Sequence, residues 1–263
     1  MAKNEYLPFP APIVDIRQET EIDYTFRLKT DLKAKNGQFV QVSLPGVGEA
    51  PISVSDFGQG YIDLTIRRCG KLTDVIHELE VGDTMFIRGP YGNGFPISEY
   101  NGQKLVINAG GTGLAPVKSI INHFYRNLND LEDMQLLVGF RSPADILFEN
   151  EIKKWEEKMP VTLTVDNGDE GWEGKEGFVT EYVEKLALDK EDSRVIIVGP
   201  PAMMKYTALE FLKAGIPEEN IWVSFERKMC CGIGKCGHCK IDDKYICVEG
   251  PVFRYDQAKN LID

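Results

Sequence analysis

The stretch KLVINAGGTGLAP, residues 104–116, carries the strongest indication of the fold. Its first part, Lys104–Asn108, is a largely apolar run typical of a buried strand, and a glycine-rich turn follows. Apolar residues then recur at helical spacing, at Val117, Ile120, Ile121, Phe124 and Leu128. Such a turn lets the backbone approach a pyrophosphate, and the helix that follows it supplies N–H donors. The alternative is a turn in which glycine serves only to reverse the chain. The candidate nucleotide-binding residues are Gly110, Gly111, Thr112, Gly113, Leu114, Ala115 and Pro116.

The same alternation of strand and helix continues toward the C-terminus. Strands are expected at 135–140, 161–165, 194–198 and 221–225, and helices near 148–155, 179–186 and 203–213. Strands that alternate with helices predict a doubly wound parallel sheet covered on both faces. After the strand 194–198 a second loop follows, with Gly199, Pro200 and Met203 as candidate nucleotide-binding residues. Both loops follow the carboxyl ends of strands, where open α/β sheets bind ligands.

Toward the N-terminus the spacing of apolar residues changes from that of a helix to the alternation of a strand. Apolar residues are spaced by two in three segments, 22–28, 40–44 and 62–66, and glycine and proline clusters separate them. Short strands of this kind predict a small closed antiparallel β-barrel, with one short helix at 72–79. Residues 67–73 resemble a second phosphate site, in which Gly70 opens the helix toward an anion. The alternative is an ordinary loop that Thr73 caps.

Five of the six cysteines lie between Cys230 and Cys247. From Cys231 the spacing is C-x4-C-x2-C-x7-C, and its first part is the plant-type [2Fe–2S] spacing. The expected ligands are Cys231, Cys236, Cys239 and Cys247. A zinc site and a redox disulfide are the alternatives, but only 236–239 has the C-x2-C spacing of a zinc knuckle. Cys230 is expected to be a buried non-ligand, with exchange for Cys231 as the alternative, and Cys69 is expected to be a packing residue.

Composition excludes several classes of function. The formal net charge of −11 disfavours binding to nucleic acids or to anionic membranes. No segment approaches the about 20 consecutive apolar residues of a membrane span. The N-terminus lacks the apolar core of a signal peptide, so a cytoplasmic location is expected.

Together these segments resemble the ferredoxin-NADP reductase superfamily, over nearly the whole chain. They look closest to the electron-transfer subunits of anaerobic sulfite reductase, sulfhydrogenase and B-type dihydroorotate dehydrogenase. Residues 226–239 resemble above all the sulfite reductase and sulfhydrogenase branch. The other segments that carry the resemblance are 110–116, 139–142, 198–203 and 247–253.

The resemblance implies three domains and three cofactors. The expected domains are an FAD-binding β-barrel (1–98), an NAD(P)-binding α/β domain (99–225) and a small [2Fe–2S] lobe (226–263). Glu226 matches a catalytic position near the flavin and the nicotinamide, and Arg141 is a candidate contact of the nicotinamide nucleotide. NADH is favoured over NADPH on resemblance alone. By the same resemblance the flavin is bound by Pro51, Ile52, Ser53, Val54, Ile66, Arg67, Arg68, Gly70, Lys71, Leu72 and Thr73.

One departure from the superfamily pattern concerns the flavin. In the pattern Arg-x-Tyr-Ser, Ala50 replaces the arginine and Ile52 the tyrosine. The pyrophosphate of FAD must then be neutralised by another residue, for which Arg67 and Arg68 are the candidates.

The function implied is an electron relay from NAD(P)H through FAD and the cluster to a catalytic partner subunit. The residues show no catalytic trio, paired carboxylates or sirohaem ligand set, so the chain is expected to serve a partner. Sirohaem and iron–sulfur subunits that reduce sulfite are the first choice for that partner. The alternatives are a sulfhydrogenase, a dihydroorotate dehydrogenase B or a ferredoxin:NADP oxidoreductase complex. An alternative of another class is a metal-stabilised regulatory module that binds a nucleotide without turnover.

Overall fold

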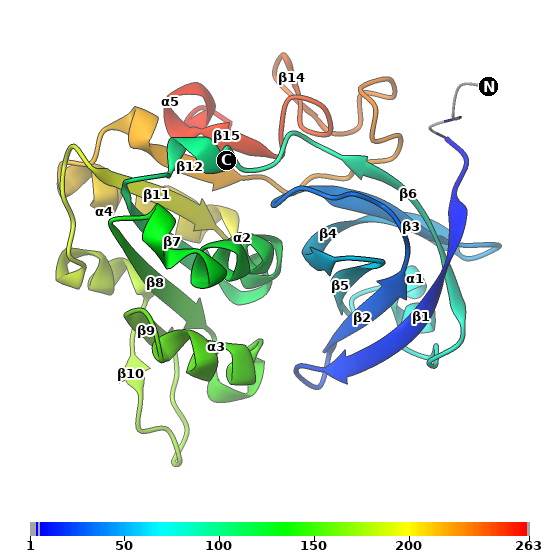
Figure 1. Cartoon of the computed structure of the whole chain (residues 1–263), viewed down its shortest axis with the longest axis horizontal. Helices are drawn as coiled ribbons and strands as arrows, with labels where there is room; N and C mark the ends of the chain where they lie inside the picture. Colours follow the sequence, from blue (N-terminus) through cyan, green and yellow to red (C-terminus); the bar gives the residue numbers. More distant parts are fainter. Residues whose placement is uncertain (1–3, 5, 262–263) are drawn as a thin grey trace. The chain divides into compact units, whose positions relative to one another are not determined.

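The computed structural model describes residue 4 and residues 6–261, in two compact units. The barrel unit comprises the chain up to Phe95 together with Phe225–Pro251, and the sheet unit comprises Pro96–Ser224 and the chain from Val252 onward. Figure 1 labels the elements along the chain.

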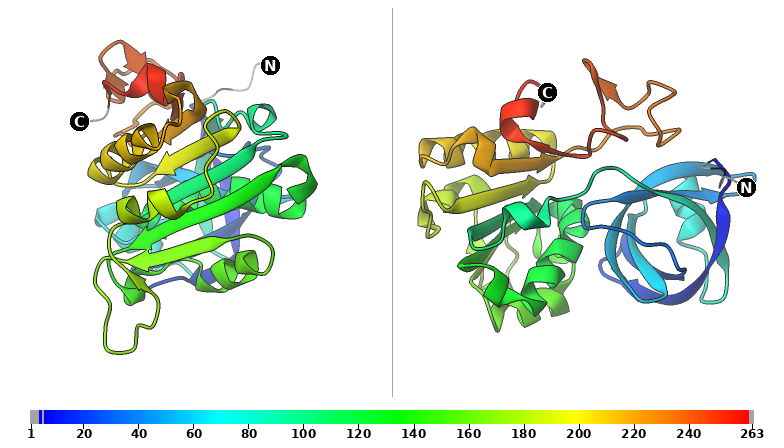
Figure 2. Two further views of the ribbon diagram at one scale, coloured as in Figure 1. Left: turned by 90° about the vertical axis from the view of Figure 1, so that its left-hand side faces the viewer. Right: turned by 45° about the horizontal axis from the view of Figure 1, so that its top comes forward.

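The barrel unit is built on a closed antiparallel barrel with the strand order β1-β2-β5-β4-β3-β6. The right-hand view of Figure 2 shows its strands, coloured blue to cyan. The strands are β1 (Phe9–Gln18), β2 (Asp23–Lys29), β3 (Phe39–Leu44), β4 (Gly48–Gly58), β5 (Tyr61–Arg67) and β6 (Thr84–Tyr91). The alternating residues of the sequence fill its interior, because successive side chains of a strand point to opposite faces. Phe26, Leu28, Val40, Val42 and Leu64 are fully buried there.

Two smaller segments complete the barrel unit. Helix α1 (Lys71–Ile76) connects β5 to β6 and is shorter than the expected helix at 72–79. Residues 225–251 contain only a small hairpin of β13 (Lys240–Ile241) and β14 (Lys244–Tyr245). The end of this segment is held by Asn93, whose backbone N–H donates to the carbonyl of Gly250 at 2.7 Å.

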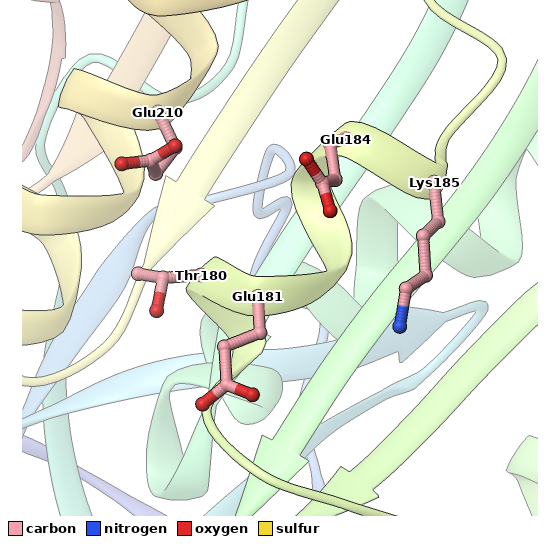
Figure 3. A pocket seen from close by; sticks show the side chains of 5 residues that line it. All are labelled: Thr180, Glu181, Glu184, Lys185 and Glu210. Carbon is pink, nitrogen blue, oxygen red and sulfur yellow. The ribbon is translucent and has the colours of Figure 1, made fainter.

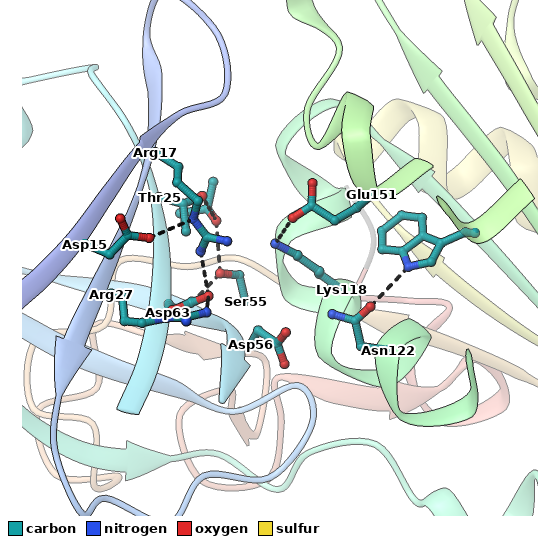
Figure 4. Close-up of polar contacts among 12 residues, drawn as sticks. Asp15, Arg17, Thr25, Arg27, Ser55, Asp56, Asp63, Lys118, Asn122 and Glu151 are labelled. Atoms are coloured by element: carbon teal, nitrogen blue, oxygen red, sulfur yellow. Dashed lines mark hydrogen bonds and ion pairs between the residues drawn. The ribbon is translucent and has the colours of Figure 1, made fainter. Parts of the chain in front are cut away.

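A cluster of charged side chains links three strands of the barrel. The carboxylate of Asp63 is buried and accepts hydrogen bonds from Arg17 (2.6 Å) and from Nε and Nη2 of Arg27 (2.7 and 2.9 Å). Figure 4 shows these side chains on neighbouring strands, beside Ser55 and Thr25. Because two guanidinium groups satisfy the carboxylate, burying its charge is tolerated.

The sheet unit is a seven-stranded sheet in the order β10-β9-β8-β7-β11-β12-β15, parallel except for its last strand. The left-hand view of Figure 2 shows the sheet, with green strands passing to yellow and orange ones. The strands are β7 (Lys104–Gly110), β8 (Asp133–Phe140), β9 (Val161–Val165), β10 (Lys175–Glu176), β11 (Ser193–Val198), β12 (Ile221–Ser224) and β15 (Val252–Arg254).

Helices cover both faces of this sheet. From β7 the chain steps to β8 and β9 in one direction and then returns to β11 and β12 on the other side of β7. Right-handed crossovers therefore place α2 and α3 on one face and η5 and α4 on the other. The α-helices are α2 (Leu114–Arg126), α3 (Glu149–Glu156), α4 (Pro201–Lys213) and α5 (Tyr255–Ala258). The 3₁₀ turns are η1 (Ile97–Glu99), η2 (Gly111–Gly113), η3 (Leu128–Asp130), η4 (Pro143–Asp145), η5 (Val179–Lys185) and η6 (Glu218–Asn220).

Helices α2 and α3 are joined by polar contacts (Figure 4). The ammonium group of Lys118, a buried residue, lies 2.8 Å from Glu151 and over the ring of Phe148. Trp155 donates from its indole nitrogen to Asn122 at 3.1 Å. These contacts hold the helix that follows the glycine-rich turn in place.

The expected fold class is confirmed by this architecture of a β-barrel and a doubly wound parallel sheet. Further local expectations differ from the structure. The helix expected at 179–186 is the 3₁₀ helix η5, and β15, which extends the sheet in the antiparallel direction, was not expected. No helix among the described residues has both the length and the apolar composition that crossing a bilayer requires.

Candidate functional site

The cysteine loop, residues 230–239, surrounds the sulfur of Cys231 with backbone donors. The N–H groups of Ile233, Lys235 and Cys236 point to this sulfur at 3.4 to 3.5 Å. The N–H of Gly234 donates to the sulfur of Cys247 at 3.2 Å. The loop can turn its N–H groups inward because Gly234 adopts a positive φ of 71°, which residues with a Cβ rarely adopt. Backbone donors of this kind stabilise thiolates that bind a metal centre.

The four expected ligands lie in two pairs. The backbone N–H of His238 and a hydrogen bond with the thiol of Cys231 lower the pKa of Cys236. Burial and a hydrogen bond with the thiol of Cys239 raise the pKa of Cys247 to about 12. The pair Cys239/Cys247 is buried, whereas Cys231 is half-buried and Cys236 is exposed.

This arrangement fits a cluster of two irons. A structural zinc ion needs four ligands around one centre, whereas a [2Fe–2S] cluster takes two thiolates on each of two irons. The two thiol pairs thus match the second kind of site better than the first.

The structure corrects the expectations for the other two cysteines. Cys230 is exposed rather than buried, and Cys69 is exposed rather than packed in the barrel. Cys69 lies outside the barrel strands because it follows the end of β5, at the start of an exposed loop. Its N–H donates to the hydroxyl of Thr73 at 2.9 Å.

The expected flavin residues lie on β4, on β5 and at the start of α1. Pro51, Ile52 and Ser53 are half-buried, whereas Val54 and Ile66 are buried. Gly70 precedes α1, so the unpaired N–H groups of the first helical turn lie directly after it. Lys71 is exposed and Leu72 half-buried. The hydroxyl of Thr73 donates to the carbonyl of Gly70 at 3.0 Å, so Thr73 shapes this loop as a cap.

The two candidate arginines differ in their contacts. Arg67 donates from Nε and Nη2 to the two carboxylate oxygens of Asp23 at 2.9 and 2.8 Å, and Asp23 is buried. Arg68 is exposed, and its Nε lies 3.1 Å from the half-buried Asp74. A guanidinium that donates two hydrogen bonds to one buried carboxylate is committed to the fold. Arg68 is therefore the better candidate for the flavin pyrophosphate.

The two candidate nucleotide loops come together at the carboxyl edge of the sheet. Strands β7 and β11 are neighbours, with Ala109 opposite Val198, and the strand order reverses between them. Open α/β sheets bind nucleotides at such a switch point. A Cβ on Gly113 would lie 2.4 Å from the carbonyl oxygen of Val198, so this glycine allows the two loops to approach.

The side chain of Met203 covers two of the glycines. A Cβ on Gly110 would lie 2.2 Å from the sulfur of Met203, and one on Gly199 would lie 2.6 Å from the same atom. These two glycines therefore make room for Met203. By contrast, nothing lies within 4 Å of a Cβ built on Gly111, which has a positive φ of 53°. The backbone is thus open to a ligand at Gly111.

Comparison with known proteins follows the same three segments. Residues 14–95 match the oxidoreductase FAD-binding domain, and residues 107–208 match the oxidoreductase NAD-binding domain. Residues 226–259 match the iron–sulfur cluster binding domain of dihydroorotate dehydrogenase B. Sulfhydrogenase 1 subunit gamma of Pyrococcus furiosus is 38% identical over 253 residues, which cover 90% of this chain and 86% of that protein.

The chain belongs to the ferredoxin-NADP reductase superfamily.

Other relatives in this superfamily extend the likeness. A probable dihydroorotate dehydrogenase B (NAD(+)) electron transfer subunit of Methanocaldococcus jannaschii is 33% identical over 254 residues, covering 96% of this chain and 91% of that protein. The structure of an NADH-dependent reduced ferredoxin-NADP oxidoreductase has a TM-score of 0.78 at 26% identity, covering 95% of this chain and 91% of its own.

These matches confirm the expected family, fold class and cofactors. As a member of the ferredoxin-NADP reductase superfamily, the chain carries FAD-binding, NAD-binding and iron–sulfur-binding domains. It is an NAD(P)H-dependent flavin and iron–sulfur oxidoreductase that transfers electrons. The alternative of a regulatory module without turnover is not supported.

In this superfamily member, one acidic residue at the carboxyl edge of the sheet was missed by the sequence analysis. Asp166 follows β9 at the carboxyl edge of the sheet, and its N–H donates to the carbonyl of Phe140 at 2.8 Å. Desolvation raises the pKa of Asp166. The positive charge of Arg141, an exposed residue, lowers this pKa in part. Only the parallel pairing of β8 with β9 brings the two residues together, so no local pattern could have indicated Asp166.

Glu226, the expected catalytic residue of this oxidoreductase, follows β12 in the chain. Although the residue as a whole is exposed, protein atoms around its carboxyl displace part of the surrounding water, and this desolvation raises the pKa of Glu226. A carboxyl with a raised pKa holds a proton more readily than an ordinary glutamate.

A hollow in the sheet unit lies outside the candidate site. Its volume is about 460 Å³, and it is lined by Thr180, Glu181, Glu184 and Lys185 of η5 and Glu210 of α4 (Figure 3). None of the expected site residues lines it. Three glutamates beside one lysine give it an acidic surface, and we assign it no role in the oxidoreductase.

Proposed function

We propose that this chain is the NADH-oxidising subunit of a redox complex and that Cys231, Cys236, Cys239 and Cys247 hold its [2Fe–2S] cluster. The observation that carries the proposal is the pairing of four thiols beneath inward-pointing N–H groups of the loop. The ligand spacing supports it independently. Cys230 is left without a role in the cluster, since the donors of the loop converge on Cys231 instead.

The other residues bind and orient the two organic cofactors. The loop 110–116, together with Gly199, Pro200 and Met203, would bind the nicotinamide nucleotide, with its pyrophosphate near Gly111. Residues 51–54 and 66–68 would hold the flavin, and the first turn of α1 after Gly70 would face the pyrophosphate of FAD, with Arg68 supplying positive charge. Glu226 would position the nicotinamide and hold a proton near the reacting atoms. A flavin accepts two electrons as hydride and releases them singly, as a [2Fe–2S] cluster requires.

The division into functional domains stays part of the proposal. The barrel at 1–98 would serve FAD, the sheet at 99–225 the nucleotide, and the segment 226–263 the cluster. The three matched segments, 14–95, 107–208 and 226–259, fall inside these ranges and support the division.

Asp166 supports a preference for NADH. A carboxylate at the carboxyl edge of a nucleotide-binding sheet can accept a hydrogen bond from a ribose 2′-hydroxyl, and it repels a 2′-phosphate. We therefore expect Asp166→Asn to raise the ratio of kcat/KM for NADPH to kcat/KM for NADH. Arg141→Ala should lower the same ratio. The check is the ratio of kcat/KM values with the two nucleotides and an artificial acceptor. An unchanged ratio in both variants would remove Asp166 and Arg141 from the specificity site.

The partner is a catalytic subunit of the same complex, in the cytoplasm. Sulfite reduction is the first candidate for its reaction, because residues 226–239 resemble the sulfite reductase and sulfhydrogenase branch. The 38% identity to a sulfhydrogenase gamma subunit favours a second candidate, a sulfhydrogenase-type complex.

Purification of the native complex under anaerobic conditions tests the proposal at two levels. The visible spectrum should show flavin and iron–sulfur absorption that bleaches when NADH is added. Material without iron and acid-labile sulfide would contradict the cluster assignment. The companion chains then decide the reaction: sirohaem subunits support sulfite reduction, and a sulfhydrogenase subunit supports the second candidate.

A further inference from the structure

Three consecutive backbone carbonyls at the start of the cysteine loop are held by side chains of the barrel. Gln41 donates from its amide nitrogen to the carbonyl of Met229. Arg88 donates from Nη2 to the carbonyl of Cys230 at 2.6 Å, and from Nη1 to that of Cys231 at 2.5 Å. Gln41 and Arg88 face each other across β3 and β6, so the two side chains share one face of the barrel.

All the donors of Arg88 are engaged. Besides the two carbonyls, its Nε and Nη2 bind the two carboxylate oxygens of Glu49, and its Nη1 lies 3.1 Å from the hydroxyl of Tyr91. A guanidinium has five N–H donors, and these five contacts use every one. The Arg88 side chain is only 6% exposed, so each donor needs such a partner.

The ring of Tyr91 packs against the same loop. A Cβ on Gly232 would lie 2.8 Å from this ring, so the glycine backbone rests directly on it. Tyr91 in turn packs against Phe39, with ring centroids 5.7 Å apart. The segment 229–232 is thus held by hydrogen bonds and by an aromatic surface.

These contacts set the direction in which the peptide groups of the loop point. With the carbonyls of residues 229–231 turned toward Gln41 and Arg88, the N–H groups of residues 233–236 are free to point at sulfur. A carbonyl turned toward the sulfurs would instead place its negative end beside thiolates. The direction of the loop dipoles therefore depends on the barrel as well as on the cysteine motif.

We propose that Arg88, together with Gln41, is a positioning residue that holds the cysteine loop in the shape that binds the cluster. The inference rests on the proposed [2Fe–2S] function and adds to it a residue outside the cysteine motif. Lysine cannot replace Arg88, because an ammonium group has only three donors on one atom, whereas Arg88 uses five donors for two carbonyls, a carboxylate and a hydroxyl.

The test uses the full chain with its cofactors, in the variants Arg88→Lys and Gln41→Met. Iron transfer to a chelator is followed under anaerobic conditions, together with the electron paramagnetic resonance spectrum of the reduced protein. Both variants should lose iron about tenfold faster than the unchanged protein, as is typical when a partner of a metal ligand is removed. Arg88→Lys should also shift the resonance spectrum. The FAD content, which reports the folded barrel, should not change.

Arg27→Lys is the matched control. Arg27 is an arginine of the same barrel, but the carboxylate that it binds is that of Asp63. The Arg27→Lys variant should lose iron at the same rate as the unchanged protein. The proposal is overturned if Arg88→Lys and Gln41→Met keep iron as the unchanged protein does, or if they lose FAD together with iron. If the unchanged protein itself holds no iron and sulfide, the proposed function fails, and the role of Arg88 fails with it.

Discussion

At the scale of single residues, the donors around Cys231 distinguish it from its neighbour Cys230. Three backbone N–H groups point at the sulfur of Cys231, whereas Cys230 is exposed. The carbonyls of both residues are bound by Arg88, so the loop cannot easily slide by one position. We therefore expect the backbone around the two thiols to favour Cys231 over Cys230 as the ligand.

We expect Cys231→Ser to abolish the iron–sulfur absorption and to lower iron and acid-labile sulfide to background. Cys230→Ser, the matched control, should keep both at the level of the unchanged protein. The reason is that serine lacks the thiolate that iron prefers, and only position 231 is surrounded by donors. Equal loss of iron in the two variants would show that either cysteine can serve.

Arg68 directly follows β5, next to Arg67. Because Arg67 is held by Asp23, Arg68 is the arginine left to face an anion after β5. Arg68→Ala should weaken FAD binding by about tenfold, the effect of losing one charge-assisted hydrogen bond. Equilibrium dialysis or fluorescence titration of the FAD-free protein measures it. Arg68→Lys should retain most of the affinity, and an unaffected alanine variant would exclude the assignment.

At the scale of elements, the approach of η2 to the end of β11 depends on Gly113. A methyl group there would meet backbone atoms of Val198, which cannot rotate away as a side chain would. Gly111 is the matched position, since it has a positive φ but open space around it. The two glycines of one turn thus serve different purposes.

Gly113→Ala should lower the free energy of unfolding by about 1–3 kcal/mol, as overpacking does. It should also weaken NADH binding, because β7 and β11 can no longer bring their loops together. Gly111→Ala should cost about 1 kcal/mol, the penalty of a left-handed residue with a side chain. Denaturant unfolding and NADH titration distinguish the two, and a larger stability loss at position 111 would reverse our interpretation.

At the scale of the whole molecule, the cysteine segment has little structure of its own. Residues 225–251 contain only the β13–β14 hairpin, whereas the barrel and the parallel sheet each have a large buried core. The cluster would supply much of the order of this segment, since metal binding contributes folding free energy where few apolar side chains are buried.

Removal of the cluster with a reductant and a chelator should therefore expose residues 230–248 to proteolysis and leave the rest folded. Limited digestion followed by mass spectrometry should find the first cuts in that range, while FAD stays bound. Digestion of the cluster-loaded protein is the control. Early cuts spread over β1–β6 would mean that the barrel also depends on the cluster.

The sequence by itself determined three strands of the barrel, five strands of the parallel sheet, the two glycine-containing loops after β7 and β11, and the cysteine spacing. These signals are local: alternation in the barrel strands, glycines after β7, and five cysteines within residues 230–247. It erred on Cys69 and Cys230, because the exposure of a residue depends on segments distant in the chain. The tertiary structure alone decided that Asp166 approaches Arg141, that Asp23 engages Arg67, and that Arg88 and Gln41 hold the cysteine loop. Each of these contacts is made across a sheet, across the barrel or between separate segments, so it depends on strand pairing and packing that no single stretch of sequence contains.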